Sequence, residues 1–272
     1  MTAISSTLTS LPFTQLRRNR YFYFWYDGIY AVLFVALIAM MRHVNHQPLI
    51  QTWDHRYWLL LPLVCQAQIL CSVWIHNCSH GNFPRPINRI IGELCGVVVL
   101  TRFASWEVIH QRHHRYSDDV EKDPHPVMAN YWKYVLFTLL NVERQLQATY
   151  FDLYGDTPET RRSEKIRAAL SFSTMLLLLA TWYTFLGPLA FFCFFVPATI
   201  IGILHLIHFN WSTHNAFSPS RDYRPVNLNT GYYKIGNLLW HGIYWHANHH
   251  KKAGLFNPGK MKNGAPIIIP GQ

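Results

Sequence analysis

The chain has 272 residues, of which 50% are hydrophobic and only 14% are charged, against roughly 25% charged in an ordinary soluble domain. The formal net charge is +10 with the histidines counted as neutral, so the aqueous surface should attract anionic lipid head groups or an anionic substrate carrier. This composition excludes an ordinary soluble domain and indicates an all-α integral membrane protein. We expect membrane lipids, and no nucleic acid, among its partners.

Four stretches are apolar and long enough to span a bilayer, which takes about 20 residues of helix. The polar N-terminus ends in Arg17, Arg18 and Arg20, so we expect no cleavable signal peptide and a first helix that acts as its own insertion signal. Only Gly187 and Pro188 separate the third and fourth stretches, which predicts a tight hairpin. The four expected spans are residues 21–41, 57–75, 168–186 and 188–207.

The distribution of lysine and arginine predicts the topology. An even number of spans places both termini on one side, and the basic terminal segments predict that this side is cytoplasmic. The stretch 81–167 should lie there too, with two interfacial helices in residues 87–103 and 131–142. Asp27 lies near the end of the first span, and we expect it to snorkel to the interface. We treat residues 1–272 as one domain.

Histidines occur in three compact clusters, and these carry the functional signal. Spacings of three and four place side chains on one face of a helix, so each cluster can direct two or three imidazoles at one point. All three clusters are expected on the same membrane face. Imidazole binds Zn, Cu, Fe and Ni, and eight histidines are too many for one ion. The clusters are His76 and His80; His110, His113 and His114; and His246, His249 and His250.

The order HxxxH, HxxHH, HxxHH on spans of this number resembles the membrane fatty acid desaturase and hydroxylase superfamily, and is closest to its acyl-lipid desaturases. Two further segments are similar to family elements: Asp118 and Asp119 followed by Asp123-Pro124-His125, and Asn210-Trp-Ser-Thr-His214. The resemblance implies a cytoplasmic, histidine-rich di-iron cap. Its implied metal ligands are His76, His80, His110, His113, His114, Asn210, His214, His246, His249 and His250.

Other polar residues near the clusters have less certain roles. His205 and His208 are minor candidates for positions beside the ligands or in the pocket, and His241 lies off the ligand face. Glu107 and Asp123 are candidates to accept the second N–H of a ligating histidine, although ordinary solvated charges explain them equally well. No catalytic residue beyond the metal ligands is apparent.

The resemblance implies an enzyme that uses two iron ions and O2 to desaturate the acyl chain of a fatty acid, an acyl lipid, an acyl-ACP or an acyl-CoA. Electrons should come from an external donor of the ferredoxin, rubredoxin or cytochrome b5 type, because no CxxCH motif or cysteine cluster is present. Acyl hydroxylase, acetylenase and carotenoid ketolase or hydroxylase remain alternatives on the same site. The sequence does not display which reaction, head group or carbon is selected.

Three other classes of protein fit the residues poorly. A di-iron carboxylate bundle needs two Glu-x-x-His pairs, and only Glu107 and His110 provide one. A zinc protease needs HExxH, but Asn77 occupies the position of the glutamate. A histidine-lined metal transporter should have ionisable residues near the bilayer midplane, whereas these histidines cluster at the ends of spans.

Overall fold

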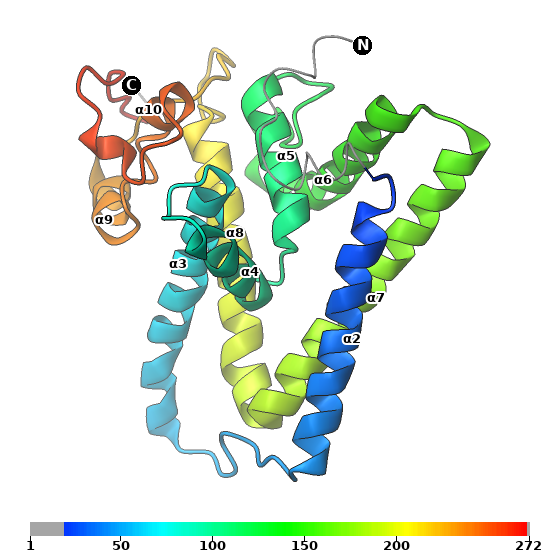
Figure 1. Cartoon of the computed structure of the whole chain (residues 1–272). Helices are drawn as coiled ribbons and strands as arrows, with labels where there is room; N and C mark the ends of the chain where they lie inside the picture. Colours follow the sequence, from blue (N-terminus) through cyan, green and yellow to red (C-terminus); the bar gives the residue numbers. More distant parts are fainter. Residues whose placement is uncertain (1–18, 271–272) are drawn as a thin grey trace. The chain divides into compact units, whose positions relative to one another are not determined.

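The structure is a computed structural model that describes residues 19–270 (Figure 1); Arg17 and Arg18 lie outside them. The described residues are helical apart from loops and two isolated bridges, from Asn227 to Trp245 and from Asn227 to Ile267. The helices are α2 (Phe22–His43), η1 (His55–Leu60), α3 (Leu61–Ser79), α4 (Ile87–Val98), α5 (Phe103–Tyr116), α6 (Tyr131–Tyr154), α7 (Pro158–Ala190), η2 (Phe191–Phe195), α8 (Val196–Thr213), α9 (Gly231–Leu239), α10 (His246–Lys251) and η3 (Pro258–Lys260).

Within residues 19–270, three helical segments are long and apolar enough to cross a membrane: Phe22–His43, His55–Ser79 and Pro158–Thr213. The last comprises 56 residues, far more than the roughly 20 that one crossing needs. It is interrupted at Gly187, where φ is 76° and ψ is 167°. A side chain there would be strained by the positive φ and would collide with Pro48. The interruption lies at the predicted hairpin.

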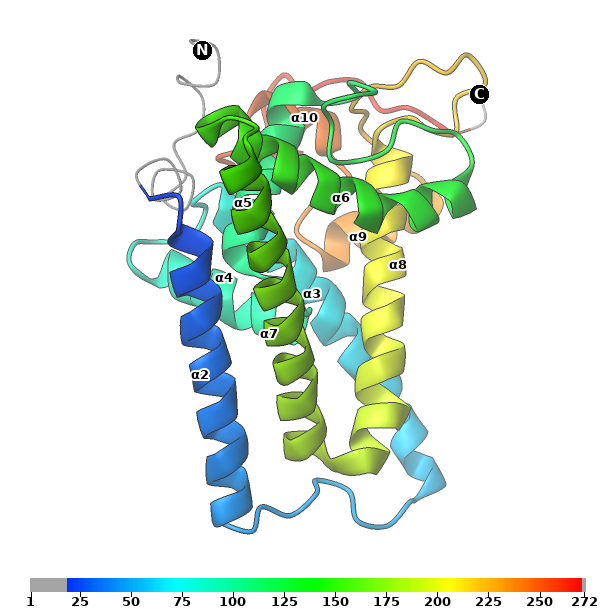
Figure 2. The ribbon, with the colours of Figure 1, turned by 90° about the vertical axis from the view of Figure 1, so that its right-hand side faces the viewer.

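The described residues form two compact units, and one of them comprises residues 19–68 and 147–201. In this unit α2 lies along α7 (Figure 2). Asp27 of α2 is completely buried, so the expectation that it snorkels is wrong. Its backbone carbonyl accepts a hydrogen bond from the Thr174 hydroxyl at 3.3 Å.

Helix α7 begins ten residues before the predicted span because its start is set by polar capping and not by hydrophobicity. The hydroxyl of Thr157 accepts a hydrogen bond from the Thr160 N–H, Pro158 occupies the first turn, and Glu159 adds a negative charge there. These are favourable residues for a helix N-terminus. A buried ion pair between Glu164 and Arg167, at 2.7 Å, follows one turn later.

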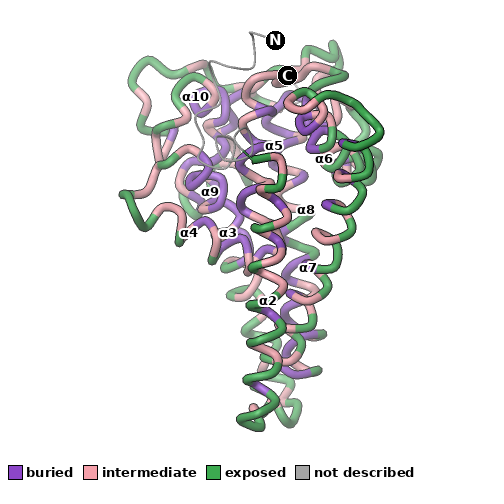
Figure 3. The backbone as a smooth tube through the Cα atoms, turned by 45° about the vertical axis from the view of Figure 1, so that its right-hand side comes forward, coloured by how far each residue is buried: buried purple, intermediate pink, exposed green. Residues whose placement is uncertain are grey.

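The other unit comprises residues 69–146 and 202–270, and it contains every predicted metal ligand. Its buried residues gather around α5, α10 and the nearby ends of α3 and α8 (Figure 3). One apolar cluster includes Val73, Phe209 and Tyr244. A second joins Ile75 of α3 to Phe103, the first residue of α5. These contacts fix the helices that carry the histidines.

Three amphipathic helices of this unit carry large apolar side chains that are exposed to the surroundings. Helix α4 exposes Ile87, Ile90 and Leu94, and α6 exposes an apolar series that begins at Trp132. Both lie where interfacial helices were predicted, but α4 ends at Val98, before the predicted end at residue 103, and α6 continues to Tyr154, beyond the predicted end at residue 142. The third, α9, was not predicted.

Candidate metal centre

The clustered histidines are contributed by helices α3, α5 and α10 and by the loops that follow α3 and α8. They reside in one unit, and their rings approach each other closely. His76 is on α3 and His80 follows it; His110, His113 and His114 are on α5; His214 follows α8; and His246, His249 and His250 are on α10.

A first group consists of His76, His80, His110 and His249, whose ligand nitrogens all lie within 4.8 Å of one another. The Nε2 atoms of His76 and His249 are 2.9 Å apart, and those of His80 and His110 are 2.8 Å apart. Each of the three sequence clusters contributes to this group.

A second group consists of His113, His214, His246 and His250, again with all ligand nitrogens within 4.8 Å. The Nε2 atom of His246 lies 3.0 Å from that of His214 and 3.1 Å from that of His250. His214 therefore joins the clustered histidines in space, as the resemblance implied from its position after Asn210.

His114 lies between the two groups. Its Nε2 atom is 3.0 Å from that of His249 and 3.2 Å from that of His110. Its ring also stacks on that of His250, with centroids 4.4 Å apart. By its nitrogen contacts His114 is a fifth member of the first group.

Asn210, the one predicted ligand that is not a histidine, is buried one helical turn before His214. Its backbone carbonyl accepts a hydrogen bond from the His214 N–H at 3.2 Å. The role of its amide side chain as a ligand stays a prediction.

The two groups have the spacing and chemistry of metal sites. Two nitrogens about 2.1 Å from one ion, at right angles, lie about 3 Å apart, which matches the Nε2 separations. The buried Nε2 atom of His113 has no hydrogen-bond partner, although buried polar atoms normally have one. Sets of four or five imidazoles suit first-row transition metals. The residues present therefore fit two metal ions.

Two aspartates orient histidines of the second group by accepting hydrogen bonds from the Nδ1 atoms of those histidines. The Nδ1–H of His113 donates to Asp123 Oδ1 at 2.9 Å, and that of His214 donates to Asp118 Oδ1 at 3.0 Å. Such contacts fix the tautomer and leave Nε2 free to bind a metal. Asp123 is itself held by the backbone N–H groups of His125 and Asp118, at 2.8 and 2.7 Å.

Of the two acids expected next to ligating histidines, only Asp123 has that position. Glu107 instead accepts a hydrogen bond from Arg89 at 2.6 Å. Asp118 was not singled out, although it stands in the acidic segment that resembles the family. Its place in that segment was the only signal the sequence offered, because its contact with His214 spans 96 positions of the chain.

Burial lowers the pKa of the clustered histidines on α5 and α10, because a charged ring would lose its hydration. The pKa of His114 is lowered to about 4, chiefly by burial and then by the nearby His214. The pKa values of His110, His113, His246, His249 and His250 are all lowered well below the ordinary value, again chiefly by burial. Neutral imidazole is the form that binds a metal, so the site is prepared for one at neutral pH.

The remaining histidines of this region lie outside both groups. His125, which was not predicted, packs its ring 4.6 Å from that of His113. His205 Nε2 lies 3.3 Å from the Tyr244 hydroxyl, and His241 accepts a hydrogen bond from the Trp74 indole at 3.3 Å. His208 lies among aromatic rings, including that of Tyr131 at 5.9 Å.

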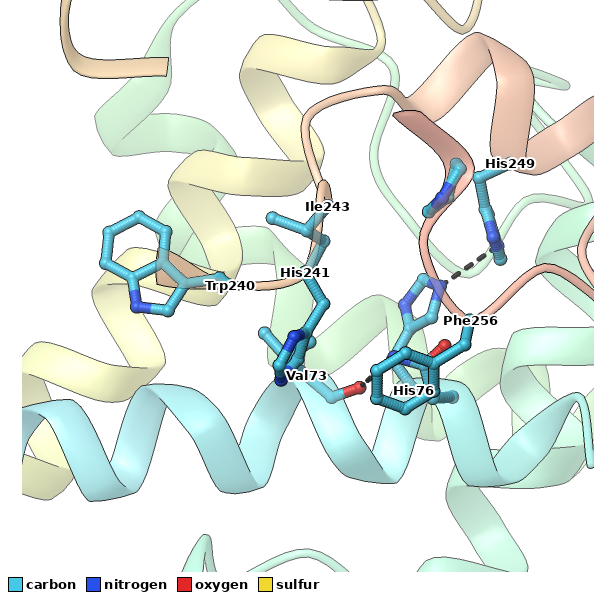
Figure 4. Close-up of a pocket in the computed structure, with 9 residues that line it drawn as sticks. Val73, His76, Trp240, His241, Ile243, His249 and Phe256 are labelled. Atoms are coloured by element: carbon cyan, nitrogen blue, oxygen red, sulfur yellow. Dashed lines mark hydrogen bonds between the residues drawn. The ribbon is translucent and has the colours of Figure 1, made fainter. Parts of the chain in front are cut away.

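A small cavity adjoins the first group (Figure 4). His76 and His249 line it together with His241 and Phe256, as Figure 4 shows. Its volume of about 10 Å³ leaves room for about one water-sized molecule. Trp106 closes another side of the group by stacking on His110, with centroids 5.3 Å apart and planes inclined by 9°.

The short helix α10 is held in place by the segment that follows it. The Asn248 Oδ1 atom accepts hydrogen bonds from Asn227 Nδ2 at 2.9 Å and from the Ala265 N–H at 2.8 Å. Its Nδ2 donates to the carbonyl of Pro258 at 3.2 Å, and the Ile268 N–H donates to the Asn227 carbonyl at 2.9 Å. Residues 258–268 therefore position the third histidine cluster.

Curated proteins similar to this chain include several desaturases. An sn-1 oleoyl-lipid 12-desaturase of a Picosynechococcus species is 31% identical over 72 residues, 25% of this chain and 21% of the relative. A Delta(12) fatty acid desaturase of Mortierella isabellina is 27% identical over 99 residues, 34% of this chain and 23% of the relative. An sn-1 oleoyl-lipid 12-desaturase of Arthrospira platensis is 22% identical over 230 residues, 71% of this chain and 64% of the relative.

The matched regions thus span from about a fifth to less than two thirds of these relatives' lengths. No solved structure matches the chain significantly. The family model described as fatty acid desaturase matches residues 53–255, which is well over half of the chain and includes every histidine of the two groups. The chain therefore belongs to the fatty acid desaturase family, a family of oxidoreductases of lipid metabolism.

Proposed function

We propose that this protein is a membrane di-iron desaturase that uses O2 to introduce a double bond into the acyl chain of a lipid. The observation that carries the proposal is the pair of buried histidine groups, each with at least four ligand nitrogens within 4.8 Å. The family match supports the reaction class. The overall reaction removes two hydrogens from the chain and, with two electrons and two protons from outside, reduces O2 to two molecules of water.

The two groups assign the residues that would hold the ions. His76, His80, His110 and His249, with His114, would hold one iron; His113, His214, His246 and His250 would hold the other, with Asn210 beside it. Iron with O2 supplies the oxidising power needed to break an unactivated C–H bond. Asp123 and Asp118 keep a proton on Nδ1 of His113 and His214, so that Nε2 is available to the metal.

Burial has a second role, because it excludes water from the reacting centre. Six of the nine clustered histidines are buried and the other three are only partly exposed, and Trp106 and Phe256 close sides of the first group. Exclusion of water prevents side reactions of a strong oxidant. We infer that the chain's own aromatic residues protect the site in this way.

An acyl lipid is the substrate that we propose. The relatives named oleoyl-lipid 12-desaturase act, by that name, on acyl lipids, and the exposed apolar helices of this chain suit a substrate that arrives from the bilayer. Acyl-ACP and acyl-CoA are the other carriers to test. Electrons would come from a separate ferredoxin, rubredoxin or cytochrome b5 type protein.

We further propose four membrane crossings with both termini and the histidine groups on the cytoplasmic side. The break at Gly187 supports two crossings within Pro158–Thr213, and the basic C-terminal segment supports the orientation. Labelling of single cysteines introduced at residues 48 and 262 would test it, since the proposal places them on opposite sides. Equal access to both from one side would contradict it.

Product analysis tests the reaction. Lipid extracts of a host that expresses the protein should contain acyl chains lighter by two hydrogens, and iron should accompany the purified protein. His249→Ala should abolish the product, whereas the matched control His55→Ala, at a side chain that is 91% exposed, should not. Chains heavier by one oxygen would indicate hydroxylation, and an unchanged product from the His249 variant would refute the site.

A further inference from the structure

Helix α9 presents an apolar stripe that no described residue of its own unit covers. Tyr232, Ile235, Leu238 and Leu239 share one face at helical spacing, and Leu238 is 83% exposed. Large exposed apolar patches mark contacts with membranes or other molecules. Figure 1 shows α9 at the edge of this unit, next to α10.

The opposite face of α9 is packed tightly against the interior. A Cβ atom at Gly236 would lie 2.5 Å from the Tyr244 ring and 2.7 Å from the Trp240 ring, so only glycine allows this approach. The side chain of Asn237 donates to the Leu228 carbonyl and accepts from the Tyr244 N–H, both at 2.9 Å. These contacts fix the orientation of the helix. Its apolar stripe therefore stays exposed at the surface.

A groove of about 510 Å³ lies beside this stripe. Ile235 and Leu238 form its apolar edge, whereas Lys234 and Lys260 form a cationic one. Trp245 contributes to the lining as well, and it immediately precedes the clustered histidine His246. The groove thus combines an apolar edge, two ammonium groups and an indole.

The surroundings of the groove carry one sign of charge. From Tyr223 to the last residue the sequence contains six lysines and arginines and no aspartate or glutamate. Within the described part of the chain, neither Lys234 nor Lys260 forms an ion pair with an acid. Both lysines are exposed, so they can bind an anion without first breaking an internal contact.

We propose that this groove binds the phosphate of an anionic glycerophospholipid of the membrane, with the acyl chains of that lipid along the apolar stripe of α9. The two lysines match a phosphate group by charge, and lysine near a lipid surface attracts anionic head groups. The adjoining stripe distinguishes a lipid from a free anion, because a soluble phosphate has nothing to place on Ile235 and Leu238. The site is independent of the reaction at the histidine groups.

The test uses the full-length protein in detergent and short-chain lipids below their micelle concentration. Binding of dioctanoyl phosphatidylglycerol, dioctanoyl phosphatidylcholine and inorganic phosphate is measured by native mass spectrometry and calorimetry. Wild-type protein should bind the phosphatidylglycerol most tightly. The double variant Lys234→Gln/Lys260→Gln should weaken its binding about 25-fold, at about fivefold for each lysine. It should weaken binding of the phosphatidylcholine much less, because the choline cation of that lipid balances the charge of its phosphate.

A matched double variant, Lys133→Gln/Lys165→Gln, removes the same charge from exposed positions outside the groove and should bind as the wild type does. Leu238→Ser should weaken both lipids to the same extent. Retention of histidine-bound metal shows that each variant is folded. Three results would overturn the proposal: wild-type affinity in the groove variant, an equal loss in the matched variant, or inorganic phosphate binding as tightly as the phosphatidylglycerol.

Discussion

The Nδ1 atom of His113 lies 2.9 Å from Oδ1 of Asp123, and neither side chain is exposed to solvent by more than 2%. Asp123 also accepts the backbone N–H groups of Asp118 and His125. One carboxylate therefore ties α5 to the loop that follows it, and it fixes the orientation of one histidine of the second group.

Asp123→Asn should weaken metal binding without removing a ligand. The amide cannot accept as strongly and does not favour the N–H form of Nδ1, and loss of such a partner typically costs 10–100-fold in metal affinity. Competition with a chelator measures the change. Glu121→Gln is the control, since this acid is exposed on the same loop; an equal loss in both variants would mean that the effect is not specific to the carboxylate at His113.

A substitution in one histidine group should remove the metal ion of that group and leave the ion of the other group in place. His249→Ala should reduce the first group's ion and His113→Ala the second's, so each purified variant should hold about half the wild-type metal, with activity lost in both. Elemental analysis per mole of protein checks this, with His55→Ala as control. Full loading of both variants would show that the two groups do not bind metal as assigned.

Stability of the metal-free protein should depend on pH. The pKa of His114 and that of His125 are both lowered to about 4, against about 6.5 in an unfolded chain. Between these values the unfolded state binds more protons, so stability falls as the pH falls, by up to about 1.4 kcal/mol per pH unit for each such histidine.

The thermal midpoint of chelator-treated protein should accordingly drop between pH 7 and pH 5. Fluorescence-detected unfolding in detergent at several pH values measures it. His55→Ala should leave the slope unchanged, because that side chain is exposed. A midpoint that is constant over this range would be incompatible with buried, neutral imidazoles.

Gly92→Ala should destabilise the unit that carries the histidines. A Cβ atom at this position of α4 would lie 2.5 Å from the ring of Phe103, which is completely buried at the start of α5. Overpacking of this kind costs about 1–3 kcal/mol. The comparison is Gly28→Ala in α2, where nothing lies within 4 Å; it should be neutral or slightly stabilising. Equal thermal midpoints for both variants would contradict the close contact.

The sequence predicted the helical class, the family and the histidines that converge, because spacings of three and four translate directly into a shared helix face. The sequence could not predict how these histidines divide between the two groups. His110 belongs to the first group and His113 to the second, although they are neighbours in one cluster. That division depends on the angle at which α5 faces α10, which only tertiary packing sets.

The sequence pattern also could not predict where the helices begin and end, or which aspartates contact the clustered histidines. Helix α7 extends beyond its apolar stretch because Thr157 caps it, and a hydropathy pattern does not register a cap. Asp118 reaches His214 across 96 positions, a contact that no local spacing contains. Helix α9 has nine residues, too few to stand out as a periodic segment.

The dependence of α10 on residues 258–268 means that the proposed metal centre can be disrupted without the loss of a histidine. A stop codon before Ala265 would leave all nine clustered imidazoles in the polypeptide, yet it would remove the backbone N–H groups of Ala265 and Ile268 that hold Asn248 and Asn227. In a genetic screen such a truncation would have the same phenotype as the substitution of a metal-ligating histidine. The residues that the metal centre needs therefore extend along the chain well beyond the last residue able to bind metal.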